Sequence, residues 1–279
     1  MKYVPENMKV ELSLKVPGNN AVNYKLHPDK LENSYFDYEW RSDNKLPITV
    51  FHKVEERDSC MRLTVQLTAA QDVYFNYRQL LSTGYRHDNC QFYMPGFWYR
   101  RNLRSPKKAP SFHTSDSWLV REDRLSAPLT GIFSEKEKRF MTVNRLDDFS
   151  MDALATHKEG EIILSGKTSL GFTGFENQQG IAMLSFGFPY REAPKSYIRK
   201  LTLAPEVEAF QLMKKGESVL LTWEIMESGA DDFSDFIQHT WEHCYDTYAP
   251  KPVENSYSIA DMKQVLSCFF VNSLVDNQP

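Results

Sequence analysis

The sequence predicts a mainly β protein, a large antiparallel β-sandwich followed by two C-terminal helices. Alternation of apolar and polar residues recurs along most of residues 1–228, and this period of two is typical of strands with one buried face. Helical spacing of apolar residues begins only near residue 233. The 279-residue chain is 41% hydrophobic and 13% aromatic, which is sufficient for one sizeable core.

The first part of the chain contains strands separated by turns. Val10, Leu12, Leu14 and Val16 alternate with polar residues, and Pro17-Gly18-Asn19-Asn20 follows with strong turn chemistry. Similar patterns predict further strands over residues 36–41, 47–53, 61–68 and 73–81. We expect these strands to form a long antiparallel run.

An aromatic and basic segment between residues 85 and 110 interrupts this pattern. It lacks regular alternation and contains a Pro95-Gly96 turn, so it predicts a long loop, and long ordered loops are commonly functional. Aromatic rings stack on sugar faces, and arginines bind hydroxyls or carboxylates. The segment therefore either contacts carbohydrate or plugs one end of the sandwich. Its candidate ligand residues are Trp98, Tyr99, Arg100 and Arg101.

A charged cluster, Arg121-Glu122-Asp123-Arg124, lies shortly after Trp118 and before Pro128. Two short strands are expected after it, over residues 129–133 and 139–143. The cluster is either a buried ion-pair network or the polar floor of a ligand cleft. An arginine partner would lower the pKa of Glu122 or Asp123, which favours a structural anion over a general acid. Trp118, Arg121, Asp123 and Arg124 complete the candidate carbohydrate contacts.

Strand patterns continue to the end of the expected sandwich. They cover residues 161–164, 168–173, 181–188, 197–203 and 218–225. Lys214-Lys215-Gly216-Glu217 predicts a hairpin turn before the last of these strands. The glycines in Gly171-Phe172-Thr173-Gly174-Phe175 indicate a strand with a bulge or a close backbone approach.

Two helices are expected after the strands. The first runs from Phe233 to Tyr248, with Asp231 or Asp232 as its N-cap and Pro250 after its end. Ser258 and Asp261 form a capping-box-like pair that opens the second helix. The wide apolar face of this second helix needs partners, so either the helix folds back onto the sandwich or the chain is the front part of a longer protein, and we favour the second alternative. We therefore expect a sandwich over residues 1–228, and a linker helix plus the first helix of a truncated helical domain over residues 229–279.

Several functional classes are excluded or disfavoured by sequence. The net charge of -4 and the scattered basic residues argue against nucleic acid, and no stretch is long and apolar enough to predict a membrane helix. The N-terminus has no signal-peptide core, so we expect a soluble chain that is either cytoplasmic or exported with its signal removed. Cys60, Cys90, Cys244 and Cys268 lack CxxC spacing and are expected to be packing thiols.

One motif resembles a metal site. His239-Thr240-Trp241-Glu242-His243 fits the H-x-x-E-H pattern, in which two histidines on one helix face share a metal. A third protein ligand is missing, because only Glu254 and Asp261 follow as nearby acids. These residues also fall on the polar side of an amphipathic helix. We interpret them as a solvated helix face, and we expect no metal, no cofactor and no catalytic residue of the common motif classes.

The order of elements resembles a known arrangement. The segments WLVREDRLSAPLTGIF and DDFSDFIQHTWEHCYDTYAP are similar to parts of the N-terminal β-supersandwich (galactose-mutarotase-like) domain of multidomain glycoside hydrolases. In that family an (α/α)6 toroid follows the sandwich. The resemblance implies that the catalytic acids lie on the toroid, beyond residue 279, and that the sandwich forms a wall of the cleft. True mutarotases use a histidine and a glutamate in the sandwich, for which His113, His157 and Glu176 could be nominated.

These observations lead to one preferred function and two alternatives. The preferred hypothesis is an accessory sandwich domain of a glycoside hydrolase, with an oligosaccharide or polysaccharide and the downstream catalytic domain as its partners. The first alternative is a stand-alone epimerase, mutarotase or polysaccharide lyase that acts in the sandwich cleft. The second is a non-enzymatic carbohydrate-binding module.

Overall fold

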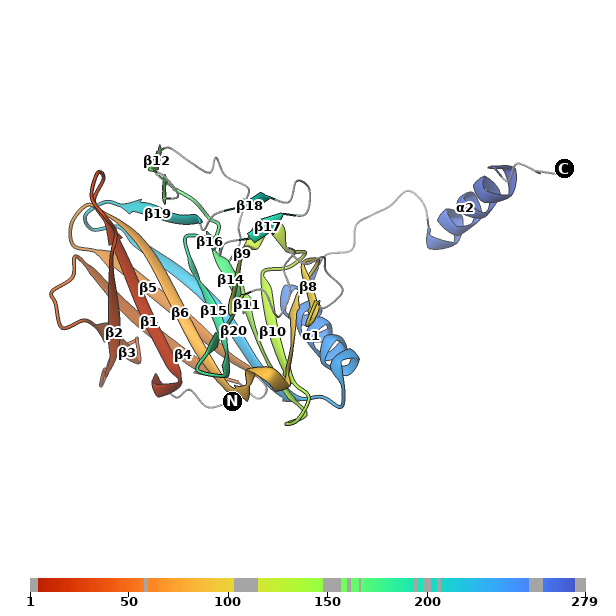
Figure 1. Cartoon of the computed structure of the whole chain (residues 1–279), viewed down its shortest axis with the longest axis horizontal. Coiled ribbons are helices and arrows are strands. Elements are labelled where there is room, and N and C mark those ends of the chain that lie inside the picture. The colour runs from red at the N-terminus through yellow and green to blue at the C-terminus, as the bar shows by residue number, and fades with distance from the viewer. Residues whose placement is uncertain are drawn as a thin grey trace. The chain divides into compact units, whose positions relative to one another are not determined.

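The computed structural model describes residues 5–57, 60–102, 115–147, 157–159, 162–165, 167–192, 195–197, 202–204, 207–250 and 258–273. It divides into two compact units, Met1–Thr240 and Trp241–Pro279. The first unit holds two large, mainly antiparallel sheets, and two helices end the described chain (Figure 1). The expected fold class is therefore confirmed. The expected domain boundary at residue 228 stays a prediction.

Sheet A is built on a long central strand, β6 (Val73–Arg86). Its strand order is β2-β1-β6-β15-β14-β9, and each neighbouring pair is antiparallel. The other strands are β1 (Met8–Lys15), β2 (Val22–Lys30), β9 (Ser117–Arg121), β14 (Phe172–Gln178) and β15 (Ile181–Phe188). At one end of β6 the sheet is extended by β19 (Val207–Met213), β16 (Arg191–Glu192), β13 (Ile162–Ser165) and β12 (His157–Glu159). A separate small sheet pairs β17 (Lys195–Tyr197) with β18 (Thr202–Ala204).

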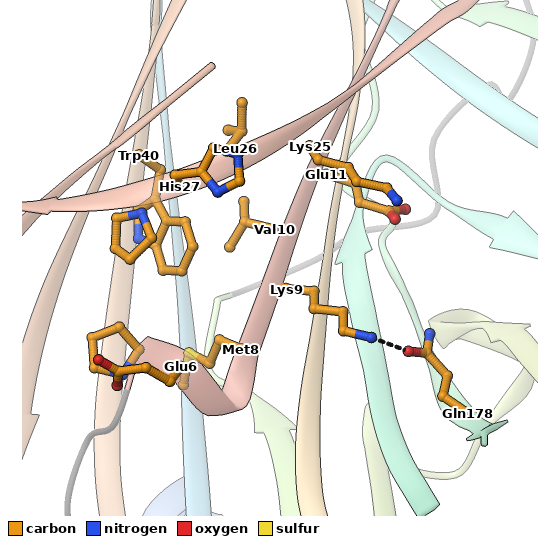
Figure 2. Close-up of a pocket in the computed structure, with 12 residues that line it drawn as sticks. Glu6, Met8, Lys9, Val10, Glu11, Lys25, Leu26, His27, Trp40 and Gln178 are labelled. Atoms are coloured by element: carbon orange, nitrogen blue, oxygen red, sulfur yellow. Dashed lines mark hydrogen bonds between the residues drawn. The ribbon is translucent and has the colours of Figure 1, made fainter. Parts of the chain in front are cut away.

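Sheet B has the order β3-β4-β5-β20-β11-β10-β7-β8. Its strands are β3 (Tyr38–Arg41), β4 (Ile48–Glu56), β5 (Cys60–Ala69), β7 (Cys90–Met94), β8 (Trp98–Arg100), β10 (Leu129–Ser134), β11 (Arg139–Arg145) and β20 (Ser218–Gly229). Strand β2 joins the two sheets. It pairs with β1 up to Leu26 and with β3 from His27 onward, and Figure 2 shows these residues where the strand changes partner.

The main core lies between the two sheets. Strand β5 alternates buried and partly buried residues along most of its length, as its sequence predicts. Aromatic side chains from both sheets meet in the middle. Phe92 of β7 stacks on Phe175 of β14 at 4.0 Å between ring centroids, and Trp223 of β20 lies 5.2 Å from Phe186 of β15. Each such fully buried side chain contributes roughly 1.5–3 kcal/mol of hydrophobic stabilisation.

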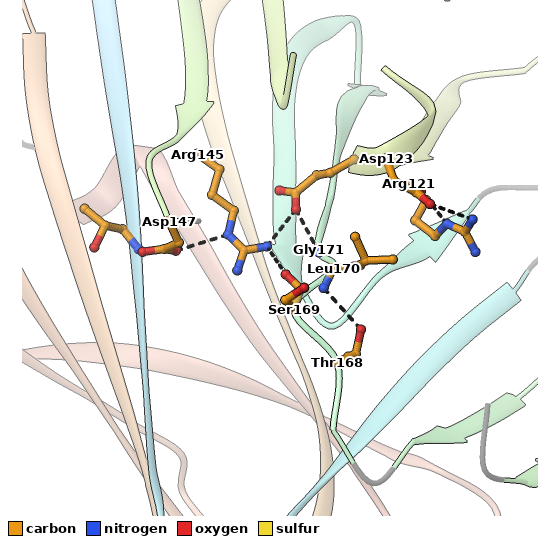
Figure 3. A network of polar contacts seen from close by, with 10 residues as sticks. Arg121, Asp123, Arg145, Asp147, Thr168, Ser169, Leu170 and Gly171 are labelled. Carbon is orange, nitrogen blue, oxygen red and sulfur yellow. Dashed lines mark hydrogen bonds and ion pairs between the residues drawn. The ribbon is translucent and has the colours of Figure 1, made fainter. Parts of the chain in front are cut away.

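A buried ion pair, Glu122–Arg145, closes one end of this core. Glu122 lies in a short 3-10 helix, η3 (Glu122–Arg124), directly after β9 of sheet A, whereas Arg145 ends β11 of sheet B. Arg145 Nη1 donates to Glu122 Oε2 at 2.6 Å, and the exposed fractions of the two side chains are 3% and 0%. Gly171 N–H donates to the same carboxylate oxygen at 2.8 Å (Figure 3).

The ion pair extends into a wider network. Arg145 also donates to the Ser169 carbonyl at 3.0 Å and to Asp147 Oδ2 at 3.1 Å, and Asp147 accepts the Thr222 N–H of β20 at 2.8 Å. Attraction to Glu122 and Asp147 outweighs burial and raises the pKa of Arg145. The expected lowering of the Glu122 pKa is wrong. Burial raises the pKa of Glu122 despite its arginine, because the carboxyl is completely enclosed and its Oε1 has no hydrogen-bond partner among the described residues.

A second buried polar group, His52, lies inside the core. Its Nε2 is 2.9 Å from Tyr77 Oη, and that hydroxyl donates to Gln79 Oε1 at 2.8 Å. Because the tyrosine proton is used by Gln79, His52 Nε2 carries a proton and donates it to Tyr77. Its Nδ1 has no hydrogen-bond partner among the described residues. Burial lowers the pKa of His52 to about 3, so the ring is held neutral.

Helix α1 (Phe233–Tyr248) starts against sheet B, as its sequence predicts. Asp232 caps it by accepting the N–H groups of Ser234 and Asp235 at 2.7 and 2.9 Å. Phe236 packs over Gly131 of β10, where an added Cβ would lie 2.6 Å from the phenylalanine ring. Of the H-x-x-E-H residues, His239 lies with its Nε2 3.5 Å from Asp235 Oδ1, one turn earlier in the helix.

Helix α2 (Ile259–Ser273) has the expected capping box, in which Ser258 and Asp261 bond to each other's backbone N–H groups. No helix in the described residues is long and apolar enough to cross a membrane. All four cysteines are free. Cys60, Cys90 and Cys244 are buried as expected for packing thiols, whereas Cys268 is exposed.

Several local expectations differ from the structure. Residues 85–102 form the end of β6 and the β7–β8 hairpin rather than a long loop, while residues 103–110 lie outside the described residues. The turn Lys214-Lys215-Gly216-Glu217 is present, with Gly216 at φ +84°, but it leads from sheet A to sheet B and closes no hairpin. Strand β14 starts at Phe172, four residues after the expected start at Thr168.

We predict that Arg145→Gln lowers the free energy of unfolding by roughly 3–5 kcal/mol, because it leaves the Glu122 carboxylate buried without its counter-charge. The matched control is Arg139→Gln on the same strand. Arg139 pairs with Glu227 at 2.9 Å, but its side chain is 50% exposed, so its loss should cost only about 0–1 kcal/mol. Urea unfolding of both variants measures the difference. Equal effects would show that the buried pair does not hold the sheets together.

We also predict that His52 makes stability depend on pH. In the unfolded chain His52 takes up a proton near pH 6.5, whereas in the folded chain it stays neutral down to about pH 3. The free energy of unfolding is therefore highest above pH 6.5 and falls as the pH decreases from 6.5 towards 3. At pH 5 the loss is about 2 kcal/mol. Urea unfolding at pH 7 and pH 5 measures this loss of unfolding free energy. We expect the loss to be absent in His52→Gln and unchanged in His27→Gln, because His27 is exposed. An unchanged slope in His52→Gln would contradict the prediction.

Candidate functional site

The face of sheet A that points away from the core carries polar residues around Arg78, whereas Phe172 of β14 belongs there to a second buried apolar cluster. Residues that pair in register across neighbouring strands point to the same face. The register therefore aligns one residue from each of the six neighbouring strands, from β9 to β2, in a row on this core-distal face. The row is Arg121, Phe172, Gly187, Arg78, Glu11 and Lys25.

Arg78 is the centre of this face. Its Nη1 contacts Glu11 Oε2 at 3.2 Å, its Nε contacts Ser185 Oγ at 3.3 Å, and its Nη2 bonds to Glu176. The guanidinium thus lies across β15, between carboxylates that come from β1 and β14. Gly187 stands opposite Arg78 in the register, and a Cβ there would collide with the Tyr77 carbonyl oxygen.

This group, which we call the Arg78 cluster (Glu11, Arg78, Ser185 and Glu176), is shielded but accessible. The exposed fractions of its charged side chains are 16% for Glu11, 15% for Arg78 and 10% for Glu176. Two carboxylates share one guanidinium, so the cluster carries one formal negative charge. Fixed, partly desolvated carboxylates and guanidinium groups form strong, directional hydrogen bonds to ligand hydroxyls.

A cavity lies next to the cluster, where β2 leaves β1. It has a volume of about 470 Å³, which is within the size range of ligand pockets. We call it the notch cavity. Buried side chains of Met8, Val10, Leu26 and Trp40 form its apolar part (Figure 2). Its polar lining is formed by Glu6, Lys9, Glu11, Lys25, His27 and Gln178.

Gln178 reaches this cavity because of a tight hairpin between β14 and β15. Gln179 and Gly180 both have positive φ, of 53° and 81°, which is the geometry of a type I′ two-residue turn. Gln178 Oε1 accepts a hydrogen bond from Lys9 Nζ at 2.6 Å, drawn as a dashed line in Figure 2. The residue that joins the notch cavity to the Arg78 cluster is Glu11, which belongs to both.

The two candidate tryptophans are core residues. Trp98 and Trp118 are 0% and 3% exposed, and their ring centroids lie 5.2 Å apart. Trp98 Nε1 donates to the Arg100 carbonyl oxygen at 2.9 Å. Their rings therefore offer no face to a sugar in this structure.

The other candidates from the β7–β8 hairpin lie nearer the surface. Tyr99 is 52% exposed, and Arg100 lies over the Phe233 ring at 5.2 Å. Arg101 is used locally, because its guanidinium donates to the backbone carbonyls of Cys90 and Asp88. Of this group Tyr99 and Arg100 have the most accessible side chains.

The charged cluster after β9 forms ion pairs, which was one of the two alternatives from the sequence. Arg121 contacts Asp123 through two hydrogen bonds of 2.6 and 2.9 Å, and Arg124 pairs with Glu192 at 2.9 Å. Arg121 also lies over the Tyr190 ring at 5.2 Å. Arg121 lies on the same face of sheet A as Arg78, but β14 and β15 separate the two residues, and Arg121 contacts no member of the Arg78 cluster among the described residues.

Sequence reasoning missed most of the residues at this face. Glu11, Arg78, Lys25 and His27 were not singled out, because each occupies an ordinary polar position in or beside a strand pattern. Glu176 is a candidate only through the resemblance to mutarotases, together with His113 and His157. His113 and the side chain of His157 lie outside the described residues. The expected absence of a metal or cofactor stays a prediction.

Comparisons with known proteins give limited similarity. No family model matches the chain, and no curated protein matches it. A polysaccharide lyase structure has a TM-score of 0.40 and 12% identity to this chain. The match covers 84% of this chain but only 27% of the lyase. A putative aldose 1-epimerase from Escherichia coli K12 has a TM-score of 0.40 and 9% identity, covering 78% of this chain and 79% of its own.

A third structure, a putative kojibiose phosphorylase from the human microbiome, has a TM-score of 0.34 and 7% identity over 95% of this chain and 27% of its own. At these identities and TM-scores, the similarities assign neither a family nor a substrate to this chain.

Proposed function

We propose that this chain is an accessory β-sandwich domain of a carbohydrate-active enzyme of the glycoside hydrolase type. In this proposal the core-distal face of sheet A contacts an oligosaccharide or polysaccharide. The observation that supports it most is the Arg78 cluster, in which Glu11 and Glu176 are held on one guanidinium beside the notch cavity.

The chemistry of this face suits a sugar. A sugar ring carries adjacent hydroxyl groups, each of which both donates and accepts hydrogen bonds. Carboxylates accept from such hydroxyls, and guanidinium and amide nitrogens donate to them. In the Arg78 cluster these groups are already fixed by one another, so little side-chain entropy is lost when a ligand binds. The cluster and the cavity together provide acceptors, donors and an apolar surface.

An accessory role fits the cluster better than a catalytic one. A general acid must hold a proton within reach of the substrate. Both carboxylates of the cluster already bond to Arg78, which holds them as ionised acceptors. In the arrangement that the resemblance implies, a helical domain beyond residue 279 supplies the catalytic acids. The sandwich then contributes a wall of the glycan cleft.

A second candidate function is catalysis by the sandwich itself, as an epimerase, mutarotase or lyase. The observation that favours it is the placement of two carboxylates on opposite sides of one guanidinium, since paired carboxylates are a common acid/base arrangement. A binding module without enzymatic activity would use the same residues for binding alone.

We predict that Glu176→Gln weakens glycan binding about tenfold, because a charged acceptor that bonds to both Arg78 and the ligand becomes a neutral amide. A glycan array identifies the tightest ligand, and isothermal titration calorimetry measures its affinity. Glu227→Gln is the matched control, since Glu227 pairs with Arg139 on sheet B. Absence of any glycan binding, or equal affinities in the two variants, would contradict the proposal.

We further predict that the chain of residues 1–279 has no turnover on aryl glycosides and does not accelerate mutarotation of free hexoses. Chromogenic release and polarimetry measure these activities. Turnover that Glu176→Gln abolishes, while Glu227→Gln retains it, would replace the accessory role with the second candidate function.

A further inference from the structure

The backbone at the end of β8 is strained. Arg100 and Asn102 have positive φ angles of 56° and 53°, in the left-handed region that residues with a Cβ rarely adopt. Two hydrogen bonds hold this conformation. Trp98 Nε1 donates to the Arg100 carbonyl oxygen at 2.9 Å, and the Asn102 N–H donates to the Tyr99 carbonyl oxygen at 3.1 Å. Strain that is held in this way clusters at functional sites.

The Arg100 side chain points away from the core, although its position in β8 predicts the reverse. Successive side chains of a strand point to opposite faces of the sheet. Arg100 is paired with Phe92, a residue of the main core. Tyr99 is paired with Tyr93, which lies on the other face against Phe233 of α1. Arg100 is nevertheless exposed, and its guanidinium lies over the Phe233 ring at 5.2 Å. The left-handed backbone thus brings two adjacent residues to the same face of sheet B.

The Tyr99 ring on this face is both accessible and fixed. Tyr99 is 52% exposed, and its Oη accepts the Gly96 N–H at 3.2 Å. The ring lies 5.4 Å from the Tyr93 ring, and the edge-on Phe233 ring lies 6.5 Å from Tyr93 in turn. A side chain that is already fixed in this way loses little entropy when a ligand packs on it.

The Arg100 guanidinium keeps its hydrogen-bond donors for a ligand. Its contact with Phe233 is a cation–π interaction, which uses the positive charge but none of the N–H groups. No described residue accepts a hydrogen bond from this side chain. Aromatic faces pack on the C–H groups of sugar rings, and guanidinium groups donate to hydroxyl oxygens. Tyr99 and Arg100 therefore supply both contacts on one face.

We propose that Tyr99 and Arg100 form a glycan subsite on the face of sheet B that points away from the core. In this subsite the Tyr99 ring stacks on one sugar ring, and Arg100 donates to hydroxyl groups beside it. This inference rests on the proposed glycan binding and adds a second contact surface to it, because the Arg78 cluster lies on sheet A, on the opposite side of the core. The two surfaces bind separate glycan chains or separate segments of one chain.

The test first weakens the Arg78 contact, so that the sheet B subsite dominates the measurement. A glycan array probed with the Glu176→Gln chain identifies the neutral oligosaccharide that this chain binds most tightly, and isothermal titration calorimetry measures its affinity. Adding Tyr99→Ala should weaken binding about tenfold, because the stacking ring is lost. Tyr99→Phe retains the ring and should keep most of the affinity.

Two matched controls accompany these variants. Tyr35→Ala removes another exposed ring, since Tyr35 is 70% exposed but lies before β3, and it should leave the affinity unchanged. Arg100→Gln should weaken binding, whereas Arg139→Gln, at a side chain of sheet B that is 50% exposed, should not.

Proton NMR of the same oligosaccharide gives a readout that does not depend on a variant that folds poorly. Sugar C–H protons that stack on the Tyr99 ring should shift upfield when the unmodified chain is added. The shift should persist with Tyr99→Phe and disappear with Tyr99→Ala.

The outcomes separate this inference from the function on which it rests. No upfield shift with the unmodified chain, or equal affinities of Tyr99→Ala and Tyr35→Ala, would overturn the sheet B subsite and leave the glycan contact of sheet A in place. Glycan binding by the unmodified chain but not by Glu176→Gln would do the same. Absence of glycan binding by the unmodified chain would overturn both.

Discussion

The ion pair between Glu122 and Arg145 is a fully buried charged contact that joins the two sheets. It lies at the end of the core, where an unpaired charge would be most costly, and it connects β9 and β14 of sheet A to β11 of sheet B. Gly171 is required there, because a Cβ would lie 2.5 Å from the Gly187 carbonyl oxygen and 2.9 Å from Glu122 Oε2. Strand β14 starts one residue later. The network thus fixes the start of β14, and β14 in turn places Glu176 near Arg78.

The candidate site results from a second constraint, the change of partner by β2. A strand that stayed beside β1 would have covered the edge of sheet A and left no cavity. Because β2 pairs with β3 from His27 onward, the two strands separate, and the buried side chains of Val10, Leu26 and Trp40 line the notch cavity at this point. Pro28 has no N–H to donate, which suits a strand that is paired with β3 on only one side at this point. The same separation places Lys25 and His27 at the mouth of the opening.

The sequence predicted those elements in which one face is buried, and the local signal explains why. Alternation located β1 and β5, the range 181–188 matched β15, and helical spacing gave the bounds of α1. Strand β2 was missed because almost all of its residues are exposed, and β7 because all of its residues are buried, so neither alternates. The site was harder to find. Glu11 and Arg78 are 67 residues apart and meet only through strand register, which no local pattern encodes.

Arg145 and Arg78 each bind two acidic groups, and burial separates their roles. Arg145 is 3% exposed and its carboxylate partner Glu122 is 0% exposed, so neither can exchange a protein partner for a ligand without opening the core. Arg78 and its two glutamates keep 10–16% of their side chains accessible on an open sheet face. A ligand hydroxyl can therefore approach Arg78 and share its hydrogen bonds while the sandwich stays closed. The charged cluster that is most prominent in the sequence stabilises the fold, whereas the less prominent one is placed where a ligand can reach it.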